Sequence, residues 1–167
     1  MRSALYVIET GTAGRLATMA RPRGGGWLDD EMAGLRESGV DVLVSALTRD
    51  EYRELDLVGE PAAANEAGLA FLQFPVVDAD IPEGTRTALE LSARLAEEVR
   101  AGRFVVTHCR AGIGRCSMLA GATLIQLGCT PEEAWRRIRE ARGFPVPDNA
   151  RQEEWLYRLA ADLGEDR

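Results

Sequence analysis

The sequence predicts an α/β fold, with one domain over residues 1–167 and a central, mostly parallel mixed sheet flanked by helices on both faces. Short apolar, β-branched runs such as 40–45 and 104–107 alternate with longer segments whose apolar residues have helical spacing. Strands that alternate with helices in this way are typical of a parallel sheet covered on both sides. A chain of 167 residues, 46% of them hydrophobic, also suits one domain with a sizeable core.

The first half of the chain is predicted to supply most of the strands. Strands are expected at 5–8, 16–19, 40–45 and 69–74, with a surface loop at 21–26. A helix over 29–37 should end at Gly39, and another short helix is expected at 59–68. Between them, Thr48 is expected to cap a helix that runs through Glu51 and Leu55.

The second half is predicted to be mainly helical. Residues 85–101 form a strongly periodic helix with its apolar positions at Leu89, Leu91, Leu95 and Val99. A strand at 104–107 and a helix at 116–127 follow, and Thr130 begins a further helix with a capping box and a proline at its first position. The last helix spans about 149–163, with its inward positions at Trp155, Leu156 and Leu159.

A glycine-rich loop from His108 to Arg115 joins the strand at 104–107 to the helix at 116–127. Successive N–H groups of such a loop converge on one point that the positive end of the helix dipole also faces, so we expect an oxyanion site. Gly112 and Gly114 are expected to adopt left-handed backbone angles that let the loop approach the anion. Because the same N–H groups and Arg115 surround Cys109, its pKa should fall far enough to leave a thiolate near neutral pH.

A thiolate beside an oxyanion site is a nucleophile directed at phosphorus, and the planar guanidinium of Arg115 would hold two phosphate oxygens. The alternative is a half-buried structural cysteine, which is the usual state of a lone cysteine. That interpretation leaves His108, the two glycines and the arginine as coincidences.

The stretch from His108 to Cys116 resembles the His-Cys-x5-Arg-Ser/Thr signature of cysteine-dependent protein tyrosine phosphatases, in particular their dual-specificity branch. Every position matches except the last, where Cys116 replaces the hydroxyl residue. Rhodanese-like sulfurtransferases have a similar loop that is usually shorter, and low-molecular-weight phosphatases carry theirs near the N-terminus. The resemblance implies a bacterial-type protein phosphatase that uses no metal or other cofactor. It also implies phosphate binding by the loop residues Arg110, Ala111, Gly112, Ile113, Gly114 and Arg115.

A departing alkoxide or phenolate needs a proton, and the loop at 74–82 carries two carboxyl groups. Its Pro-x-x-Asp pattern resembles the general-acid loop of dual-specificity phosphatases, with Asp78 at the matching position and Asp80 as the reserve candidate. His108 is expected to orient the catalytic loop through hydrogen bonds rather than to transfer protons. The stretch 149–156 resembles the Asn-x-x-Gln helix of the same branch, so Gln152 is a candidate for placing the hydrolytic water, with a surface glutamine as the commoner interpretation.

Composition restricts the partners. The net charge of −7 makes the chain a poor general binder of nucleic acid or anionic membranes, and all of its basic residues are arginine, which suggests a GC-rich bacterial genome. No signal peptide or membrane span is expected, and the odd number of cysteines favours the reducing cytoplasm. In the family that the loop resembles, members that act on polyphosphorylated inositol lipids tend to carry basic residues at both of the positions occupied here by Arg110 and Ile113. The apolar Ile113 therefore favours a phosphotyrosyl protein over highly charged head groups, while phosphoserine and phosphothreonine, and the oligomeric state, stay open.

Cys116 leads to two further hypotheses. A thiol donates a weaker hydrogen bond than the usual hydroxyl, so breakdown of a phosphocysteine should be slower than in a serine-bearing protein, or the chain could be a catalytically weak phosphate-binding module. A second sulfur could also trap oxidised Cys109 as a reversible disulfide. The alternative is that Cys116 only fills a small site at the start of the helix.

Overall fold

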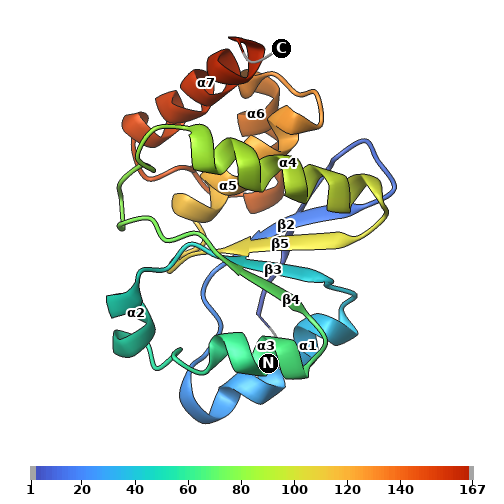
Figure 1. The fold of residues 1–167 in the computed structure, drawn as a ribbon, viewed down its shortest axis with the longest axis vertical. Coiled ribbons are helices and arrows are strands. Elements are labelled where there is room, and N and C mark those ends of the chain that lie inside the picture. Colours follow the sequence, from blue (N-terminus) through green and yellow to red (C-terminus); the bar gives the residue numbers. More distant parts are fainter. Residues whose placement is uncertain (1–2, 166–167) are drawn as a thin grey trace.

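A computed structural model describes residues 3–165 and contains one five-stranded sheet with the strand order β1-β2-β5-β3-β4 (Figure 1). The strands are β1 (Tyr6–Ile8), β2 (Arg15–Met19), β3 (Val42–Ser45), β4 (Ala70–Gln73) and β5 (Phe104–His108). β1 pairs antiparallel with β2, and all the other neighbours are parallel. The predicted mixed, mostly parallel sheet is therefore confirmed, with β5 at its centre.

Helices cover both faces of this sheet. They are α1 (Leu28–Glu37), α2 (Arg49–Glu54), α3 (Glu60–Glu66), α4 (Arg86–Arg100), α5 (Arg115–Gln126), α6 (Pro131–Arg142) and α7 (Ala150–Glu165), with a short 3₁₀ turn at Gly25–Trp27. In Figure 1, α4 to α7 lie above the sheet, and α1 and α3 lie below it. The predicted strands and helices are all found, with ends that differ by no more than two residues.

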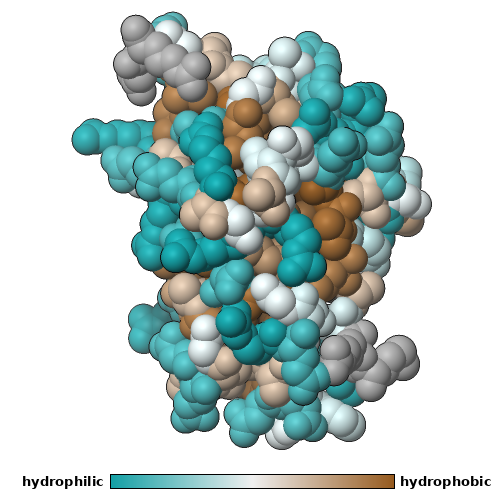
Figure 2. Space-filling model, turned by 90° about the vertical axis from the view of Figure 1, so that its right-hand side faces the viewer, coloured by the Kyte–Doolittle hydropathy of each residue, from teal (hydrophilic) through white to brown (hydrophobic). Residues whose placement is uncertain are grey.

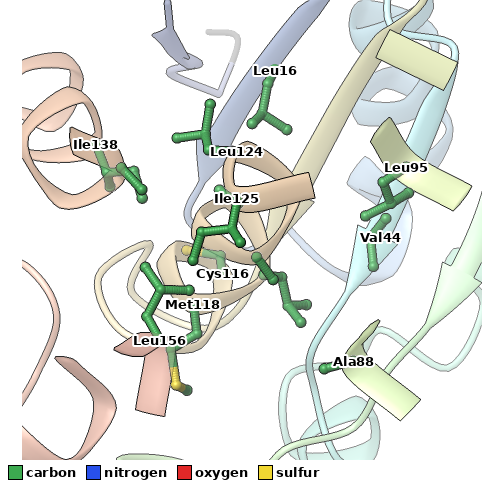
Figure 3. Packing of buried hydrophobic residues seen from close by; sticks show 14 of the residues in the cluster. Leu16, Val44, Ala88, Leu95, Cys116, Met118, Leu124, Ile125, Ile138 and Leu156 are labelled. Carbon is green, nitrogen blue, oxygen red and sulfur yellow. The ribbon is translucent and has the colours of Figure 1, made fainter. Parts of the chain in front are cut away.

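Two apolar cores follow from the alternation of side chains along the strands. On β3, Val42 and Val44 face the first core, between the sheet and α4 to α7. Leu43 faces the second core, between the sheet and the helices α1 and α3. Figure 3 shows Val44 of β3 and Leu95 of α4 within the first core. On the face that Figure 2 draws, hydrophilic side chains cover most of the surface.

The helix α5 is almost entirely buried within the first core. Every residue from Arg115 to Ile125 is buried, including Cys116. A Cβ on Gly121 would lie 2.7 Å from Leu156 of α7, so the glycine lets these two helices approach closely. Deep burial on all sides fixes the position of the α5 N-terminus, where the glycine-rich loop ends.

The inward face of α4 uses only part of its apolar periodicity. Leu95 and Val99 are buried, whereas Leu89 and Leu91 are only half-buried. The small side chains Ala88, Ser92 and Ala96 take the remaining buried positions of this helix. Small residues let α4 pack close to α5, and the larger leucines are left at the edges of the contact.

The described residues contain no helix that is both long and apolar enough to cross a membrane.

Candidate active site

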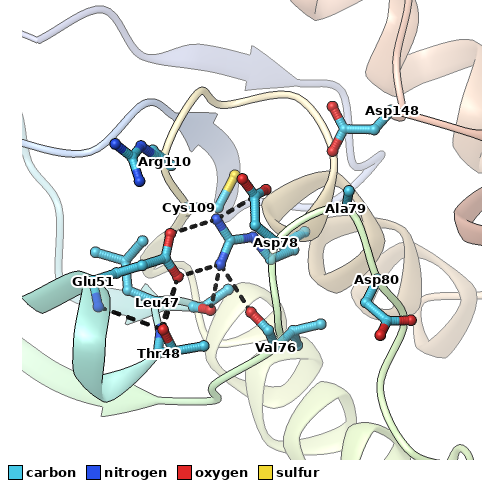
Figure 4. Close-up of polar contacts among 12 residues, drawn as sticks. Leu47, Thr48, Glu51, Val76, Asp78, Ala79, Asp80, Cys109, Arg110 and Asp148 are labelled. Atoms are coloured by element: carbon cyan, nitrogen blue, oxygen red, sulfur yellow. Dashed lines mark hydrogen bonds and ion pairs between the residues drawn. The ribbon is translucent and has the colours of Figure 1, made fainter.

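The glycine-rich loop starts at the carboxyl end of β5, where parallel sheets commonly bind ligands. Its neighbours are the segments that follow β3 and β4. Ala46 donates its N–H to the carbonyl of His108 at 2.9 Å, and Val76 donates to the carbonyl of Ala46 at 3.0 Å. These bonds continue the sheet beyond its strands, so residues 46–48 and 74–80 are held beside the loop (Figure 4).

The two loop glycines are required for different reasons. Gly112 has φ +72°, as expected, and a Cβ there would lie 2.8 Å from the backbone nitrogen of Ala20. The expectation of a left-handed angle at Gly114 is wrong, because this residue has φ −97°. A Cβ at Gly114 would instead lie 2.1 Å from Asp148 Oδ2 and 2.6 Å from Gln152 Oε1. Gly114 thus makes room for polar groups that precede and begin α7.

Cys109 lies at the bottom of this loop with 2% of its surface exposed. Its Sγ is 3.3 Å from the Sγ of Cys116, and when Cys109 is ionised only the Cys116 thiol can donate in this pair. The Cys116 thiol is the largest influence on the Cys109 thiol, and with the N–H groups of Cys116 and Gly112 and the charge of Arg115 it outweighs burial and lowers the pKa of Cys109 to about 5. Cys109 is therefore a thiolate at neutral pH. Burial and the neighbouring thiolate raise the pKa of Cys116, which stays a thiol.

Arg115 is almost fully buried, and Glu51 of α2 holds it by a bidentate ion pair. Nη1 lies 2.6 Å from Oε1, Nη2 lies 2.9 Å from Oε2, and Nη1 also donates to the carbonyl of Val76 at 2.8 Å. Burial raises the pKa of Glu51, but hydrogen bonds from Arg115 and Thr48 outweigh it, so the pKa is below its usual value. The helix α2 and the segment after β4, both far from the loop in sequence, thus fix the orientation of the Arg115 guanidinium.

The capping box of α2 fixes Glu51 in turn. Thr48 Oγ1 accepts from the Glu51 N–H, and the Thr48 N–H donates to Glu51 Oε1 at 3.0 Å. The sequence indicated this helix and its cap but not the contact of Glu51 with Arg115. The capping pattern Thr48-x-x-Glu51 was the available signal, since it restricts where the carboxylate can point.

The two candidate acids of the 74–82 loop point in different directions (Figure 4). The Asp78 carboxylate lies 3.2 Å from Arg115 Nη2, and its side chain is 61% exposed. Asp80 Oδ1 instead accepts from the N–H of Ile81 and pairs with Arg151 at 3.3 Å. Ala79 between them has φ +61°, which turns the chain. The structure therefore brings Asp78, and not Asp80, to Arg115.

Gln152 is fully buried beside the loop rather than on the surface. Its Oε1 accepts from the Asp148 N–H at 2.9 Å and its Nε2 donates to the Asp80 carbonyl at 3.0 Å. Asp148, which the sequence did not single out, lies with Gln152 against Gly114. Burial and then the charge of Asp78 raise the pKa of Asp148 above its usual value.

The remaining candidates lie around the loop. His108 is fully buried, with its Nε2 at 2.7 Å from Oε2 of Glu60. Arg110 is exposed at the edge of the loop, 3.6 Å from Glu54, and its carbonyl accepts from the N–H of Arg21. Ala111 and Ile113 form the loop turn with Gly112, whose carbonyl accepts from Arg142 Nε at 2.9 Å. Within residues 3–165 no group of three or more His, Cys, Asp or Glu side chains could hold a metal ion.

A family model described as "Polymorphic toxin system, DSP-PTPase phosphatase" matches residues 17–129, which include the loop, Glu51 and Asp78. The chain belongs to this DSP-PTPase family. The family is one of dual-specificity-type protein phosphatases.

Two curated relatives of this chain are the same protein from two organisms. Cyclin-dependent kinase inhibitor 3 of Rattus norvegicus is 23% identical over 131 residues, and that of Homo sapiens is 24% identical over 135 residues. Each alignment covers 77% of this chain but only 61% and 63% of the relatives, respectively. The chain thus spans less than two-thirds of the length of these relatives.

Solved structures show the same fold. A kinase associated phosphatase with serine in place of its catalytic-site cysteine has a TM-score of 0.88 at 18% identity, covering 98% of this chain and 97% of the other. Tk-PTP in its active form has a TM-score of 0.74 at 26% identity, covering 89% and 92%, respectively. The sheet and helices of this chain are therefore arranged as in protein tyrosine phosphatases.

Proposed function

We propose that this phosphatase hydrolyses phosphotyrosine in proteins through a phosphocysteine intermediate, with Cys109 as nucleophile. The observation that carries the proposal is the lowered pKa of Cys109 at the base of a loop whose other end is Arg115. A thiolate is the reactive form of cysteine, and here it faces backbone N–H groups suited to phosphate oxygens.

In the first step the Cys109 thiolate attacks phosphorus in line with the leaving oxygen. The S–P bond forms as the P–O bond to the substrate breaks, and Asp78 donates its proton to the departing oxygen. Arg115 and the N–H groups of residues 110–115 hold the equatorial oxygens, on which charge increases in the transition state.

Arg115 can hold phosphate while Glu51 keeps it in place. A guanidinium has five N–H donors. Nη1 donates to Glu51 and to the Val76 carbonyl, and Nη2 donates once to Glu51. The edge of Nη2 that contacts Asp78 is left for the substrate. Phosphate bound at this edge displaces Asp78 from Arg115, and the displaced carboxyl is then next to the leaving oxygen.

In the second step a water molecule attacks the phosphocysteine. Asp78 accepts a proton from the water, the S–P bond breaks, and the electron pair returns to Cys109 as a thiolate. The Cys116 thiol, 3.3 Å away, donates its hydrogen bond to the departing sulfur. Gln152 is the candidate for placing the water, since its amide is buried beside Gly114.

The substrate class follows from the loop. Exposed Arg110 adds one positive charge at the rim, and Ile113 contributes an apolar side chain suited to a phenyl ring rather than to a second phosphate.

The three cysteines are free in the structure, which fits a reducing cytoplasm. Hydrolysis of phosphoserine and phosphothreonine is a separate outcome of the test below.

Hydrolysis of an aryl phosphate and of a phosphotyrosyl peptide, both with a metal chelator present, tests the function. The wild type and Cys129→Ser, which removes the half-buried cysteine that follows α5, should be active, and Cys109→Ser should be inactive. Binding without hydrolysis in the wild type would identify a phosphate-binding module. A Cys109 persulfide formed from thiosulfate would identify a sulfurtransferase instead.

A further inference from the structure

A buried carboxylate from a different element contacts the histidine next to the nucleophile. Glu60 is the first residue of α3, and none of its surface is exposed. Its Oε2 lies 2.7 Å from Nε2 of His108, and its Oε1 has no hydrogen-bond partner among the described residues. Burial of a carboxylate is unfavourable unless a charge or hydrogen bonds compensate for it. The contact with His108 is therefore the interaction that must compensate for the burial of Glu60.

The hydrogen bonds of His108 restrict where its protons can be. Its Nδ1 lies 3.1 Å from the carbonyl oxygen of Cys109, and a carbonyl can only accept, so Nδ1 carries a hydrogen. At 2.7 Å the contact between Nε2 and Glu60 Oε2 must also contain one proton. Either His108 is an imidazolium beside an ionised Glu60, or both groups are neutral with the proton on Glu60.

The surrounding charges favour the imidazolium. The groups that face the pair are Cys109 from the loop and Tyr52 from α2. Burial and the nearby Glu60 and Glu51 charges raise the pKa of Tyr52 to about 12, against a hydrogen bond to Ser45, so Tyr52 is neutral. Burial lowers the pKa of His108, but Glu60, the Cys109 carbonyl and the Cys109 thiolate together outweigh burial and raise it.

We propose that Glu60 is a positioning residue that keeps His108 as an imidazolium and thereby stabilises the Cys109 thiolate. The ring contacts Cys109 through Nδ1 and Glu60 through Nε2, so it lies between the Glu60 carboxylate and the loop. The charges of His108 and the Cys109 thiolate interact, and the nearer positive charge has the larger effect on Cys109. The role rests on the proposed function, because it takes Cys109 as the nucleophile.

Nitrogen NMR of the wild-type protein tests the charge state directly, since His108 is the only histidine of the chain. At pH 7 the spectrum should show a hydrogen on both ring nitrogens. An Nε2 resonance of the unprotonated type at this pH would overturn the proposal, and this result does not depend on phosphatase activity.

The variant Glu60→Gln tests the effect on the nucleophile. A glutamine amide can still donate a hydrogen bond to neutral Nε2, so the contact is retained while the carboxylate charge is lost. The pH dependence of Cys109 alkylation by iodoacetamide, read by peptide mapping, should shift upward by about one pH unit, the lower end of the effect of a nearby charge. Glu66→Gln, an exposed change on the same helix, is the matched control and should leave the profile unchanged.

The two proposals fail in different ways. An unchanged alkylation profile in Glu60→Gln overturns the positioning role of Glu60, whether or not the protein hydrolyses phosphate. A shifted profile in a protein that hydrolyses no phosphate ester supports the role of Glu60 and contradicts the proposed function. If Glu60→Gln does not fold, the wild-type NMR experiment still decides the charge of His108.

Discussion

Cys116 is the residue at which this chain departs from the phosphatase signature. Its thiol donates to Cys109 at 3.3 Å and is the largest influence that lowers the Cys109 pKa. A hydroxyl is the stronger donor, so Cys116→Ser should speed phosphoenzyme breakdown. We expect a higher kcat with substrates for which the second step is rate-limiting, measured by burst kinetics. A burst phase unchanged in rate and amplitude, together with an unchanged kcat, would contradict this role.

The same pair of sulfurs predicts a response to peroxide. Peroxide oxidises the Cys109 thiolate to a sulfenic acid, and the Cys116 thiol then condenses with it to form a disulfide and water. Wild-type protein inactivated by mild peroxide should regain activity with a dithiol, as should Cys129→Ser, whereas Cys116→Ser should be inactivated irreversibly. Recovery of Cys116→Ser to the wild-type extent would show that Cys116 only fills its site.

Asp78 and Asp80 differ in their contacts, and this predicts different kinetic effects. Asp78→Asn should slow phosphotyrosine hydrolysis by roughly 10²–10⁴-fold, the usual contribution of general acid–base catalysis. The loss should be smaller for aryl phosphates with acidic leaving groups, which need less protonation. Asp80→Asn, which removes only contacts with Ile81 and Arg151, is the control. A leaving-group dependence seen in Asp80→Asn instead would reassign the acid.

At the scale of elements, two glycines on α5 and its N-cap predict separable effects. Gly121→Ala places a Cβ 2.7 Å from Leu156 of α7, and overpacking of this kind costs about 1–3 kcal/mol of unfolding free energy. Gly114→Ala displaces Asp148 and Gln152, which lie beside the site, so turnover should fall. Denaturant unfolding and kcat measured on both variants check this. Equal losses of kcat in the two variants would contradict a role for the Asp148–Gln152 segment in turnover.

The helices and strands could be predicted because each depends on local sequence. The buried β-branched runs of β3 and β5 and the capping threonines of α2 and α6 carry their own signals. The inward face of α4 could not, because it depends on how closely α5 approaches. Leu89 and Leu91 satisfy helical periodicity but lie only half-buried at the edge of this core, whereas Ala88, Ser92 and Ala96 take buried positions beside Leu95 and Val99.

The site was predictable only where one short segment carries its chemistry. Cys109, Arg115 and Asp78 lie in compact patterns, and the structure brings all three together. Three further acidic residues contact the loop from parts of the chain that are far away in sequence: Glu51 from α2, Glu60 from α3 and Asp148 from the segment before α7. No local sequence pattern indicates which loop residue each of them contacts. The left-handed angle expected at Gly114 was wrong for a similar reason, because the neighbours that require glycine there are far along the chain.

At the scale of the whole molecule, the fold brings the nucleophile at the end of the central strand together with an acid from the loop after β4 and with two carboxylates from the helices α2 and α3. Cys109 directly follows β5 and Arg115 begins α5. The segment after β4 supplies Asp78, and α2 and α3 supply Glu51 and Glu60. The chain belongs to the DSP-PTPase family, and the central feature of its proposed function is a covalent bond between Cys109 and phosphorus.

Rapid acid quenching during turnover of an aryl phosphate, followed by peptide mapping, measures that bond directly. The account predicts a phosphoryl group on the peptide that contains Cys109, formed in the wild type with a metal chelator present and absent in Cys109→Ser. Full turnover with no phosphorylated Cys109 at any quench time, or the same phosphopeptide in Cys109→Ser, would contradict it.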